Sequence, residues 1–498
     1  MGEESLKTEF QTPLKSFALL SLSNLLLQVY GGVYRIYLIR HLGAEPFGLM
    51  GMIFPFYRLL VIIITMGLPT AIVRLIAIEQ VKNNQAWILR IKKKACYLVT
   101  TSALIISLLL FVFSESIGSF LYNDLRTGLI LKYFALAITL NSLCLVYRGY
   151  FHGLNRIAPL VFSEIAETLG ETVFVLLSLF TPLLANNVEA STQLLAKGFL
   201  LGEGTCLLAL FIYDQIIVRP KLTTSKGPSL RGRKLSGLVK SSLPLMAQQL
   251  ILSLSKIADG VLLPKLLKEG GLTPSLIAKE LGEYWGMATP LIFLPLILFS
   301  PLSTLILPAT AKATMEKNLS LFFKKIRSML GFSLLYSLGI SLLLLSYGKP
   351  LSLVLYKTTS ALRYLPFLLP ALPFMIMNNL LIPVAEGLGK QGFLLRATLI
   401  LILIKTGISA AFVPLPTFGL AGAAWGVTIS QALFFCLLFK ETVFSKVSTS
   451  KWFLLFHPKY MSPYKLRNCL IQLFEINPTR NCLTIYLIGM PWKIRQLA

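Results

Sequence analysis

Apolar stretches long enough to cross a lipid bilayer recur along almost the whole chain, from Ser16 to Lys440. The hydrocarbon core of a bilayer is about 30 Å thick, and a helix needs about 20 apolar residues to cross it. Hydrophobic residues make up 55% of the 498 positions and charged residues only 14%, whereas soluble domains have about 45–50% and 25%. The sequence therefore predicts an all-α, multi-pass membrane protein.

The hydropathy pattern predicts twelve transmembrane helices. They cover residues 16–39, 47–77, 95–113, 128–151, 157–184, 194–218, 238–263, 284–310, 326–346, 363–385, 393–414 and 418–439. Several contain prolines, whose freed backbone carbonyls need partners from neighbouring helices or water. We therefore expect kinked helices packed around a central cavity. The first stretch is long enough to span and continues into further spans, so we interpret it as an uncleaved helix.

Basic residues are distributed unevenly between the predicted loops. The amino terminus and the loops after the second, sixth and eighth spans carry roughly twice as many Lys and Arg as the opposite loops. Cytoplasmic loops are enriched in basic residues, so both termini are predicted to be cytoplasmic. We attribute the net charge of +26 to this topology rather than to a nucleic-acid partner.

A long basic loop after the sixth span divides the chain into two halves. We predict a first six-helix bundle over residues 1–218, a cytoplasmic linker over 219–237 and a second six-helix bundle over 238–440. Residues 441–498 have no apolar run long enough to cross and carry eight Lys and Arg against two Glu. Such a basic tail is expected on the anionic cytoplasmic leaflet.

The two halves contain similar stretches at matching helix ranks. Residues 16–40 resemble 241–265, and residues 150–160 resemble 383–393, at an offset of about 230 residues. Transporters often contain such repeats, with the substrate site near the midplane of the membrane between them. We therefore expect two pseudo-symmetric bundles around one cavity.

Three glutamates occupy the first half of the fifth predicted span. Glu164 and Glu171 are seven residues apart and so lie within about 20° of each other on a helix, with Glu167 about 60° away. Intramembrane carboxylates usually face a cavity or an ionic partner. Cavity lining is the interpretation we favour; the alternative is an interfacial Glu164, with the other two paired to cations of neighbouring helices.

Cations also occur inside predicted spans. Arg35 in the first span and Arg58 in the second are candidates for binding phosphate oxygens, because a guanidinium group binds them through two parallel hydrogen bonds. Arg74 and Arg148 are expected instead to extend toward the cytoplasmic interface.

In the seventh span, Lys256 and Asp259 are one helical turn apart and are expected to neutralise each other. They are further candidates for the cavity. The chain contains no GxSxG, Walker, HExxH or strand-associated GxGxxG motif, its six cysteines have no CxxC spacing, and its three histidines are far apart. The sequence thus gives no indication of an enzyme, a cofactor or a metal site.

Four stretches resemble a known family. LIRHLGAEPFGLMGMIFPFYRLL (38–60) and MGLPTAIVRLIA (66–77) are similar to the start of polysaccharide exporters in the multidrug/oligosaccharidyl-lipid/polysaccharide superfamily. YRGYFHGLNRIAPLVFSEIAE (147–167) and GEYWGMATPLIFLPLILFSPLSTLILPATAKA (282–313) resemble its stage V sporulation protein B-like branch more closely. The resemblance covers about residues 15–440.

The resemblance implies a flippase that moves an undecaprenyl-linked saccharide, such as a peptidoglycan precursor for the spore cortex, across the bacterial cytoplasmic membrane. Related flippases rely on arginines of the first two helices, and Arg35 and Arg58 occupy similar places. Glu167 matches a carboxylate of the family pattern, whereas Glu164 and Glu171 are additions. Membrane lipids, a coupling cation or proton and cell-wall synthases are the further partners implied. Relatives usually have two more helices where this chain has its basic tail.

Other functions remain compatible with the residues. A cation-coupled multidrug exporter also uses intramembrane carboxylates, but it does not require arginines that face the cavity. A membrane-embedded glycosyltransferase or polymerase predicts catalytic groups in a large outer loop, and the longest candidate, 264–283, has no histidine. A scaffold for cell-wall assembly without transport is a third alternative. The acidic face would bind either sugar hydroxyls or a coupling cation.

The predicted topology is testable by labelling of single cysteines. In a variant that lacks the native cysteines, a cysteine at Pro228 should react with a membrane-impermeant reagent only after the membrane is opened, because the basic 219–237 segment is predicted to be cytoplasmic. A cysteine at Thr417, in a predicted outer loop, should react in intact cells. Labelling of position 228 from outside would contradict the topology.

Overall fold

The computed structural model describes residues 23, 25–81, 84–179, 187–218, 235–297, 299–315 and 319–444. Within these residues the secondary structure is helical throughout and contains no strand, which confirms the all-α class. The chain divides into two compact units, Met1–Cys436 and Leu437–Ala498. Of the second unit, residues 437–444 are described, and they are helical.

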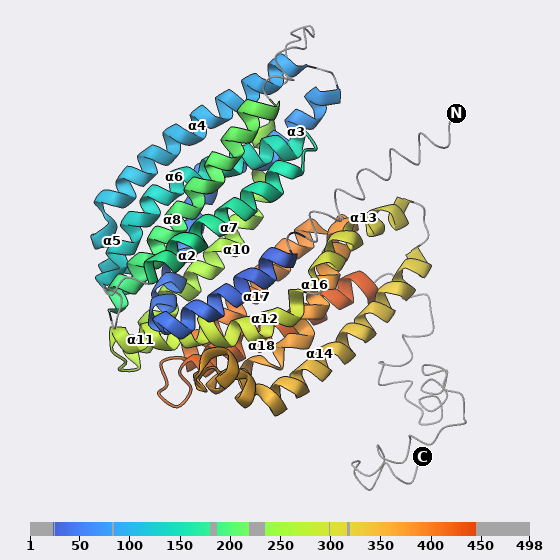
Figure 1. Cartoon of the computed structure of the whole chain (residues 1–498). Coiled ribbons are helices and arrows are strands. Elements are labelled where there is room, and N and C mark those ends of the chain that lie inside the picture. Colours follow the sequence, from blue (N-terminus) through green and yellow to red (C-terminus); the bar gives the residue numbers. More distant parts are fainter. Residues whose placement is uncertain are drawn as a thin grey trace. The chain divides into compact units, whose positions relative to one another are not determined.

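Figure 1 shows the order of the helices. The first half contains a helix over residues 25–42, α2 (Glu45–Thr65), α3 (Leu68–Val81), α4 (Gln85–Val112), α5 (Ser114–Tyr122), α6 (Arg126–Gly153), α7 (Ala158–Leu179), α8 (Val188–Tyr213) and η2 (Asp214–Val218). The second half contains α10 (Leu235–Glu269), α11 (Pro274–Leu281), η3 (Gly282–Ala288), α12 (Thr289–Ile297), α13 (Ser300–Met315), α14 (Leu319–Tyr356), η4 (Ser360–Arg363), α15 (Leu365–Leu368), α16 (Ala371–Gly387), α17 (Gln391–Phe412), α18 (Leu420–Phe439) and η5 (Lys440–Phe444).

Each of the twelve predicted spans overlaps a helical segment. Eight helices among the described residues are long and apolar enough to cross a membrane. α7 has a comparable length, 22 residues, but carries the three glutamates. The predicted 219–237 linker lies outside the described residues except for its last three, which begin α10, and the predicted 441–498 tail is described only as far as residue 444.

The second predicted span, 47–77, is two helices rather than one. α2 ends where Met66 and Gly67 both adopt positive φ angles, of 46° and 70°, and α3 begins at the next residue. Residues in the left-handed conformation terminate a helix. Pro69 follows in the first turn of α3, where a backbone N–H would have no acceptor within the helix, so proline is tolerated there. The eighth predicted span, 284–310, is likewise divided, into η3, α12 and α13.

The predicted internal repeat has a counterpart in backbone geometry. After α6, Asn155 has a φ of 54°, its N–H binds the carbonyl of His152, and the N–H of the following residue reaches back to Phe151. After α16, Gly389 has a φ of 73° and its N–H binds the carbonyl of Glu386 in the same pattern. Matched helix ends 234 residues apart are expected if the halves share an origin.

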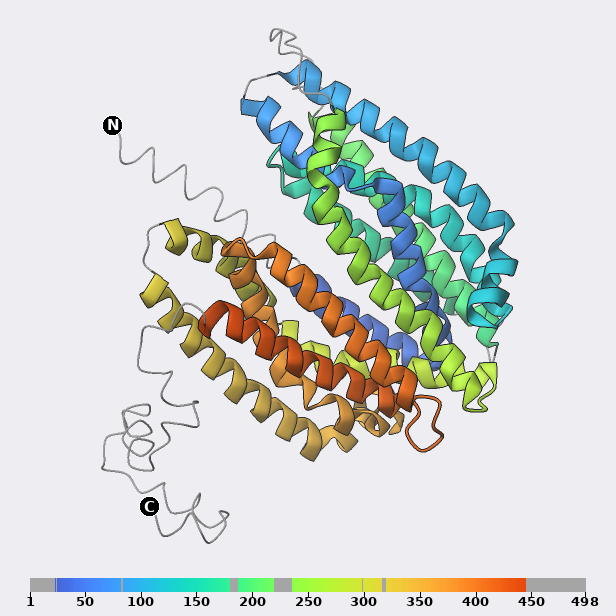
Figure 2. The ribbon, with the colours of Figure 1, turned by 180° about the vertical axis from the view of Figure 1, so that it is seen from behind.

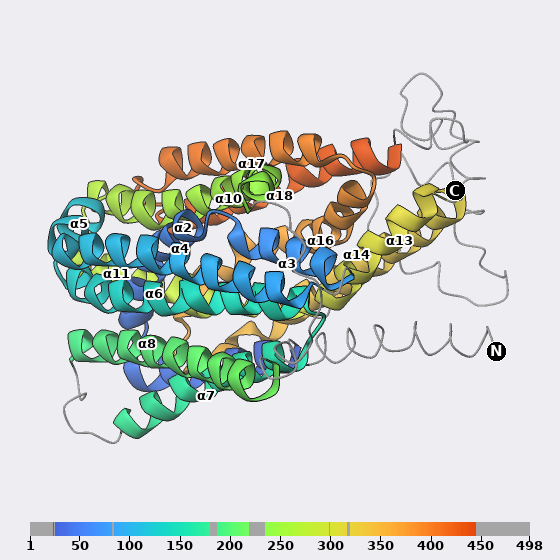
Figure 3. The same ribbon diagram turned by 90° about the horizontal axis from the view of Figure 1, so that it is seen from above.

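The two halves touch through backbone at one end of the first unit. A Cβ added to Gly48 of α2 would lie 1.8 Å from the carbonyl oxygen of Ala278 in α11, and one added to Gly282 would lie 1.8 Å from that of Ala44. α10 lies beside both α2 and α17 (Figure 2, Figure 3). On the predicted topology this joined end faces the outside of the cell.

Replacing Gly48 by Ala is expected to destabilise the protein by about 1–3 kcal/mol, because the methyl group has no space and the two backbones must move apart. The matched control is Gly339→Ala in α14, where nothing lies within 4 Å of the added Cβ. Thermal unfolding of the purified protein in detergent compares the two variants. A melting temperature for Gly48→Ala equal to or above that of Gly339→Ala would contradict the close contact.

Candidate functional site

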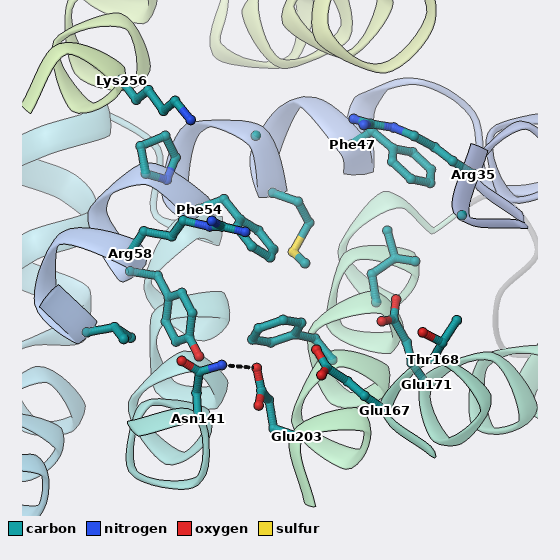
Figure 4. A pocket seen from close by; sticks show the side chains of 18 of the residues that line it. Arg35, Phe47, Phe54, Arg58, Asn141, Glu167, Thr168, Glu171, Glu203 and Lys256 are labelled. Atoms are coloured by element: carbon teal, nitrogen blue, oxygen red, sulfur yellow. Dashed lines mark hydrogen bonds between the residues drawn. The ribbon is translucent and has the colours of Figure 1, made fainter. Parts of the chain in front are cut away.

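A cavity of about 990 Å³ opens among helices of both halves. Its walls come from the helix over residues 25–42, α2, α6, α7, α8 and α10 (Figure 4). Five of the seven candidate residues of the sequence analysis line it. They are Arg35, Arg58, Glu167, Glu171 and Lys256.

One side of the cavity, here called the acidic wall, carries three carboxylates. Glu167 and Glu171 extend from α7, and Glu203 extends from α8 (Figure 4). The amide of Asn141 in α6 donates a hydrogen bond to Oε1 of Glu203. Glu203 is only 1% exposed, and its Oε2 has no partner among the described residues. The acidic wall therefore holds a buried carboxylate oxygen that borders the cavity without a donor.

Glycines bring α7 and α8 into the contact that forms this wall. A Cβ at Gly202 of α8 would lie 2.9 Å from the carbonyl oxygen of Glu167, and one at Gly198 would lie 2.4 Å from Val175. The Thr205 hydroxyl donates across the same interface to the carbonyl of Ala166, at 2.8 Å. Small residues four apart let membrane helices approach closely, and this spacing places Glu203 beside the two α7 carboxylates.

Arg148 binds the acidic wall instead of extending to the interface. Its Nη2 lies 2.6 Å from Oε2 of Glu167, and it also donates to Sγ of Cys206 at 3.3 Å. The expectation that Arg148 would extend to the interface was wrong, because a carboxylate one helix away offers a stronger partner than the membrane surface. Glu167 thus both lines the cavity and forms an ion pair.

Three cations lie across the cavity from the carboxylates and form the basic wall. They are Arg35 of the first helix, Arg58 of α2 and Lys256 of α10 (Figure 4). None of them forms a salt bridge within the described residues. The Arg35 guanidinium lies 5.9 Å from the centre of the Phe47 ring, and its Nε is buried without a hydrogen-bond partner in the described part of the chain.

The remaining two candidates do not line the cavity. Glu164 lies one turn before Glu167 and is half-buried. From the sequence, Asp259 was expected to pair with Lys256. Its Oδ2 instead lies 2.6 Å from Nζ of Lys405 in α17, and this Nζ also donates a hydrogen bond to the Ser255 hydroxyl. That expectation was wrong because α10 packs against α17, whose lysine reaches the carboxylate directly.

An aromatic cluster closes the apolar part of the cavity. Phe54 and Tyr57 of α2 contact Phe134 and Phe199 with ring centroids 5.0–5.6 Å apart, mostly edge to face. Phe54, Tyr57 and Phe199 line the cavity. The cavity therefore offers a cationic side, an anionic side and aromatic rings to one bound molecule.

Three residues that matter here were not identified from the sequence: Glu203, Asn141 and Lys405. Glu203 and Lys405 are charges inside predicted spans, so the rule that selected the α7 glutamates also identifies them. No sequence signal distinguishes Asn141. Among the described residues, no group of three or more His, Cys, Asp or Glu side chains could hold a metal ion.

Comparisons with known proteins agree with this architecture. The model of the family described as "Polysaccharide biosynthesis protein" matches residues 14–314. Stage V sporulation protein B of Bacillus subtilis (strain 168) is 26% identical over 428 residues, which cover 85% of this chain and 82% of that protein.

Solved structures are similar in fold at low identity. "Lipid II flippase MurJ, inward closed conformation" gives a TM-score of 0.61 at 16% identity and covers 96% of this chain and 95% of that one. A multidrug resistance MATE family transporter of the MOP superfamily in an inward-facing conformation gives 0.62 at 15% identity, covering 87% and 100%. The family match confirms the resemblance to polysaccharide biosynthesis proteins, and the likeness to these structures confirms the multi-pass membrane fold.

The Asp259–Lys405 ion pair is expected to act in stability. Lys405→Met should lower the melting temperature, because it leaves the half-buried Asp259 without its partner. Adding Asp259→Asn should restore part of the loss, with a coupling energy of about 1–3 kcal/mol. Thermal unfolding of the two single variants and the double variant measures this coupling, and additive losses would show that the pair contributes nothing.

Proposed function

This chain belongs to the polysaccharide biosynthesis protein family, and we propose that it is a flippase for an undecaprenyl-linked saccharide. In this proposal it moves the lipid-linked headgroup across the cytoplasmic membrane by alternating access. A peptidoglycan precursor for the spore cortex is the proposed substrate. Two relatives support this choice, one named stage V sporulation protein B and the other described as a lipid II flippase.

The observation that carries the proposal is the basic wall. Arg35, Arg58 and Lys256 border a cavity inside the membrane-spanning region without a salt bridge in the described residues. An uncompensated intramembrane cation costs a few kcal/mol or more, and such groups usually serve a substrate or ion pathway. A diphosphate supplies the missing negative charge, and a guanidinium group binds its oxygens through paired hydrogen bonds.

The remainder of the cavity suits a saccharide. Asn141 and the carboxylates provide donors and acceptors for hydroxyl groups, while Phe54 and Phe199 provide apolar ring surfaces. Its volume of about 990 Å³ is at the upper end of the range for small-molecule sites. The isoprenoid tail would stay in the lipid, so the cavity has to hold only the headgroup.

Arg58 and Arg35 act in succession in this proposal. Arg58 comes from the middle of α2 and is exposed to the cavity, so it captures the diphosphate first. Arg35, more deeply placed beside Phe47, receives it as the other side opens. Transport of this kind makes and breaks no covalent bond, so no catalytic residue is required.

A cation-coupled multidrug exporter is the second candidate, and the acidic wall favours it. Glu171 has no hydrogen bond or ion pair within the described residues, and Glu203 has an unpartnered oxygen. A cationic drug would nevertheless meet three cations in the same cavity. This repulsion makes the exporter the weaker proposal.

Substitutions of Arg58 test the proposal. Arg58→Ala should abolish translocation of a labelled lipid-linked precursor in reconstituted vesicles, because the guanidinium is the exposed cation of the basic wall. Arg58→Lys should retain part of the activity, since a lysine keeps the charge but loses the planar pair of donors.

The matched control is Arg74→Ala in α3, an exposed arginine that does not line the cavity. Its rate should stay near that of the unaltered protein. Full activity in both Arg58 variants would require another site for the diphosphate.

A further inference from the structure

We propose that the transported headgroup bears a positively charged amine as well as its phosphates, and that Glu171 and Glu203 bind this amine. The inference rests on the proposed function, because it specifies a chemical group of the lipid-linked substrate. It follows from the charges of the acidic wall and from what is available to neutralise them.

Only one of the three carboxylates of the acidic wall has an ionic partner in the described residues. Arg148 neutralises Glu167. Glu203 receives one hydrogen bond from a neutral amide, that of Asn141, and its second oxygen is buried without a donor. Glu171 has no side-chain hydrogen bond or ion pair within the described residues. Burying a carboxylate without a compensating donor or charge is unfavourable, so the cavity is complementary to a ligand that brings positive charge and hydrogen-bond donors.

The basic wall does not supply that charge. Arg35, Arg58 and Lys256 come from three other helices and lie on the opposite side of the cavity (Figure 4). No salt bridge joins them to the carboxylates within the described part of the chain. A ligand with phosphates alone satisfies the basic wall and leaves the acidic wall uncompensated. A ligand with a phosphate end and an ammonium end satisfies both.

An ammonium group fits the acidic wall better than a bare metal ion does. Hard cations such as Ca²⁺ take six to eight oxygen ligands at about 2.3–2.6 Å, whereas no group of three candidate ligands is arranged for a metal among the described residues. An ammonium group offers three donors, and two carboxylates on adjacent helices accept them. The large cavity holds the sugar that carries the amine.

The test uses two synthetic undecaprenyl diphosphate disaccharides that differ only at C6 of the terminal sugar, with a primary amine in one and an acetamide in the other. Initial translocation rates are measured in vesicles that contain the full chain. The unaltered protein should prefer the amine on the order of tenfold. Glu203→Gln and Glu171→Gln should reduce this preference to about twofold or less, because glutamine keeps the shape but removes the charge and replaces one acceptor oxygen by a donor.

Two controls isolate the charge from folding. Glu203→Asp keeps the carboxylate and should retain most of the preference. Glu189 lies on the same helix as Glu203 but is exposed and outside the cavity. The Glu189→Gln variant should therefore show the same preference for the amine as the unaltered protein. Melting temperatures of all variants identify any loss that arises from misfolding.

Equal rates for both lipids in the unaltered protein would overturn the inference while leaving the flippase proposal intact. A preference that survives both glutamine substitutions would also overturn it. If the carboxylates bind an inorganic cation instead, the substitutions should slow both lipids equally and leave their ratio unchanged. Failure to move either lipid, with Arg58→Ala indistinguishable from the unaltered protein, would instead refute the proposed function.

Discussion

A charge inside a bilayer needs either an opposite charge or a hydrated space, and this requirement governs how the helices are arranged. Isolated charges at membrane depth cost several kcal/mol, so each one constrains the position of its neighbours. Two ion pairs join different helices inside the predicted spans: Arg148–Glu167 and Lys405–Asp259. Five other charges border one cavity, where water or a ligand can solvate them: Arg35, Arg58, Lys256, Glu171 and Glu203.

Lipid tails are as apolar as leucine, so hydrophobicity alone cannot hold membrane helices together. Among the described residues, close helix contacts are accordingly made at glycines. Gly48 and Gly282 join the two halves, and Gly198 and Gly202 join α8 to α7. The contact of Gly198 and Gly202 with α7 also shapes the cavity, since it places Glu203 in the acidic wall. Packing and site formation are thus achieved by the same small residues.

The sequence was sufficient for the all-α membrane fold and for the helix that carries the α7 glutamates, because these depend on hydropathy and helical period. The ionic partners could not be predicted in the same way. Lys405 lies 146 residues from Asp259, and only the packing of α17 against α10 makes it the partner in place of Lys256. The partner of Arg148 could not be predicted either. Its position near the end of a span suggested the membrane surface, whereas the packing of α6 against α7 brings it to Glu167. The role of each candidate in transport stays a prediction.

The unequal pairing of charges has an electrical consequence. A membrane potential does work of about 2.3 kcal/mol per elementary charge per 100 mV on charges that cross it. Lys405 and Asp259 form a neutral pair, so rearranging the helices that carry them moves little net charge. The basic wall differs on the proposed function, because Arg35, Arg58 and Lys256 would carry unpaired charge when the cavity is empty and a bound diphosphate would neutralise most of it. The three cations of the basic wall outnumber the two unpaired carboxylates of the acidic wall, so on the proposed function a potential that is negative inside would favour the state in which the empty cavity lies nearer the cytoplasm.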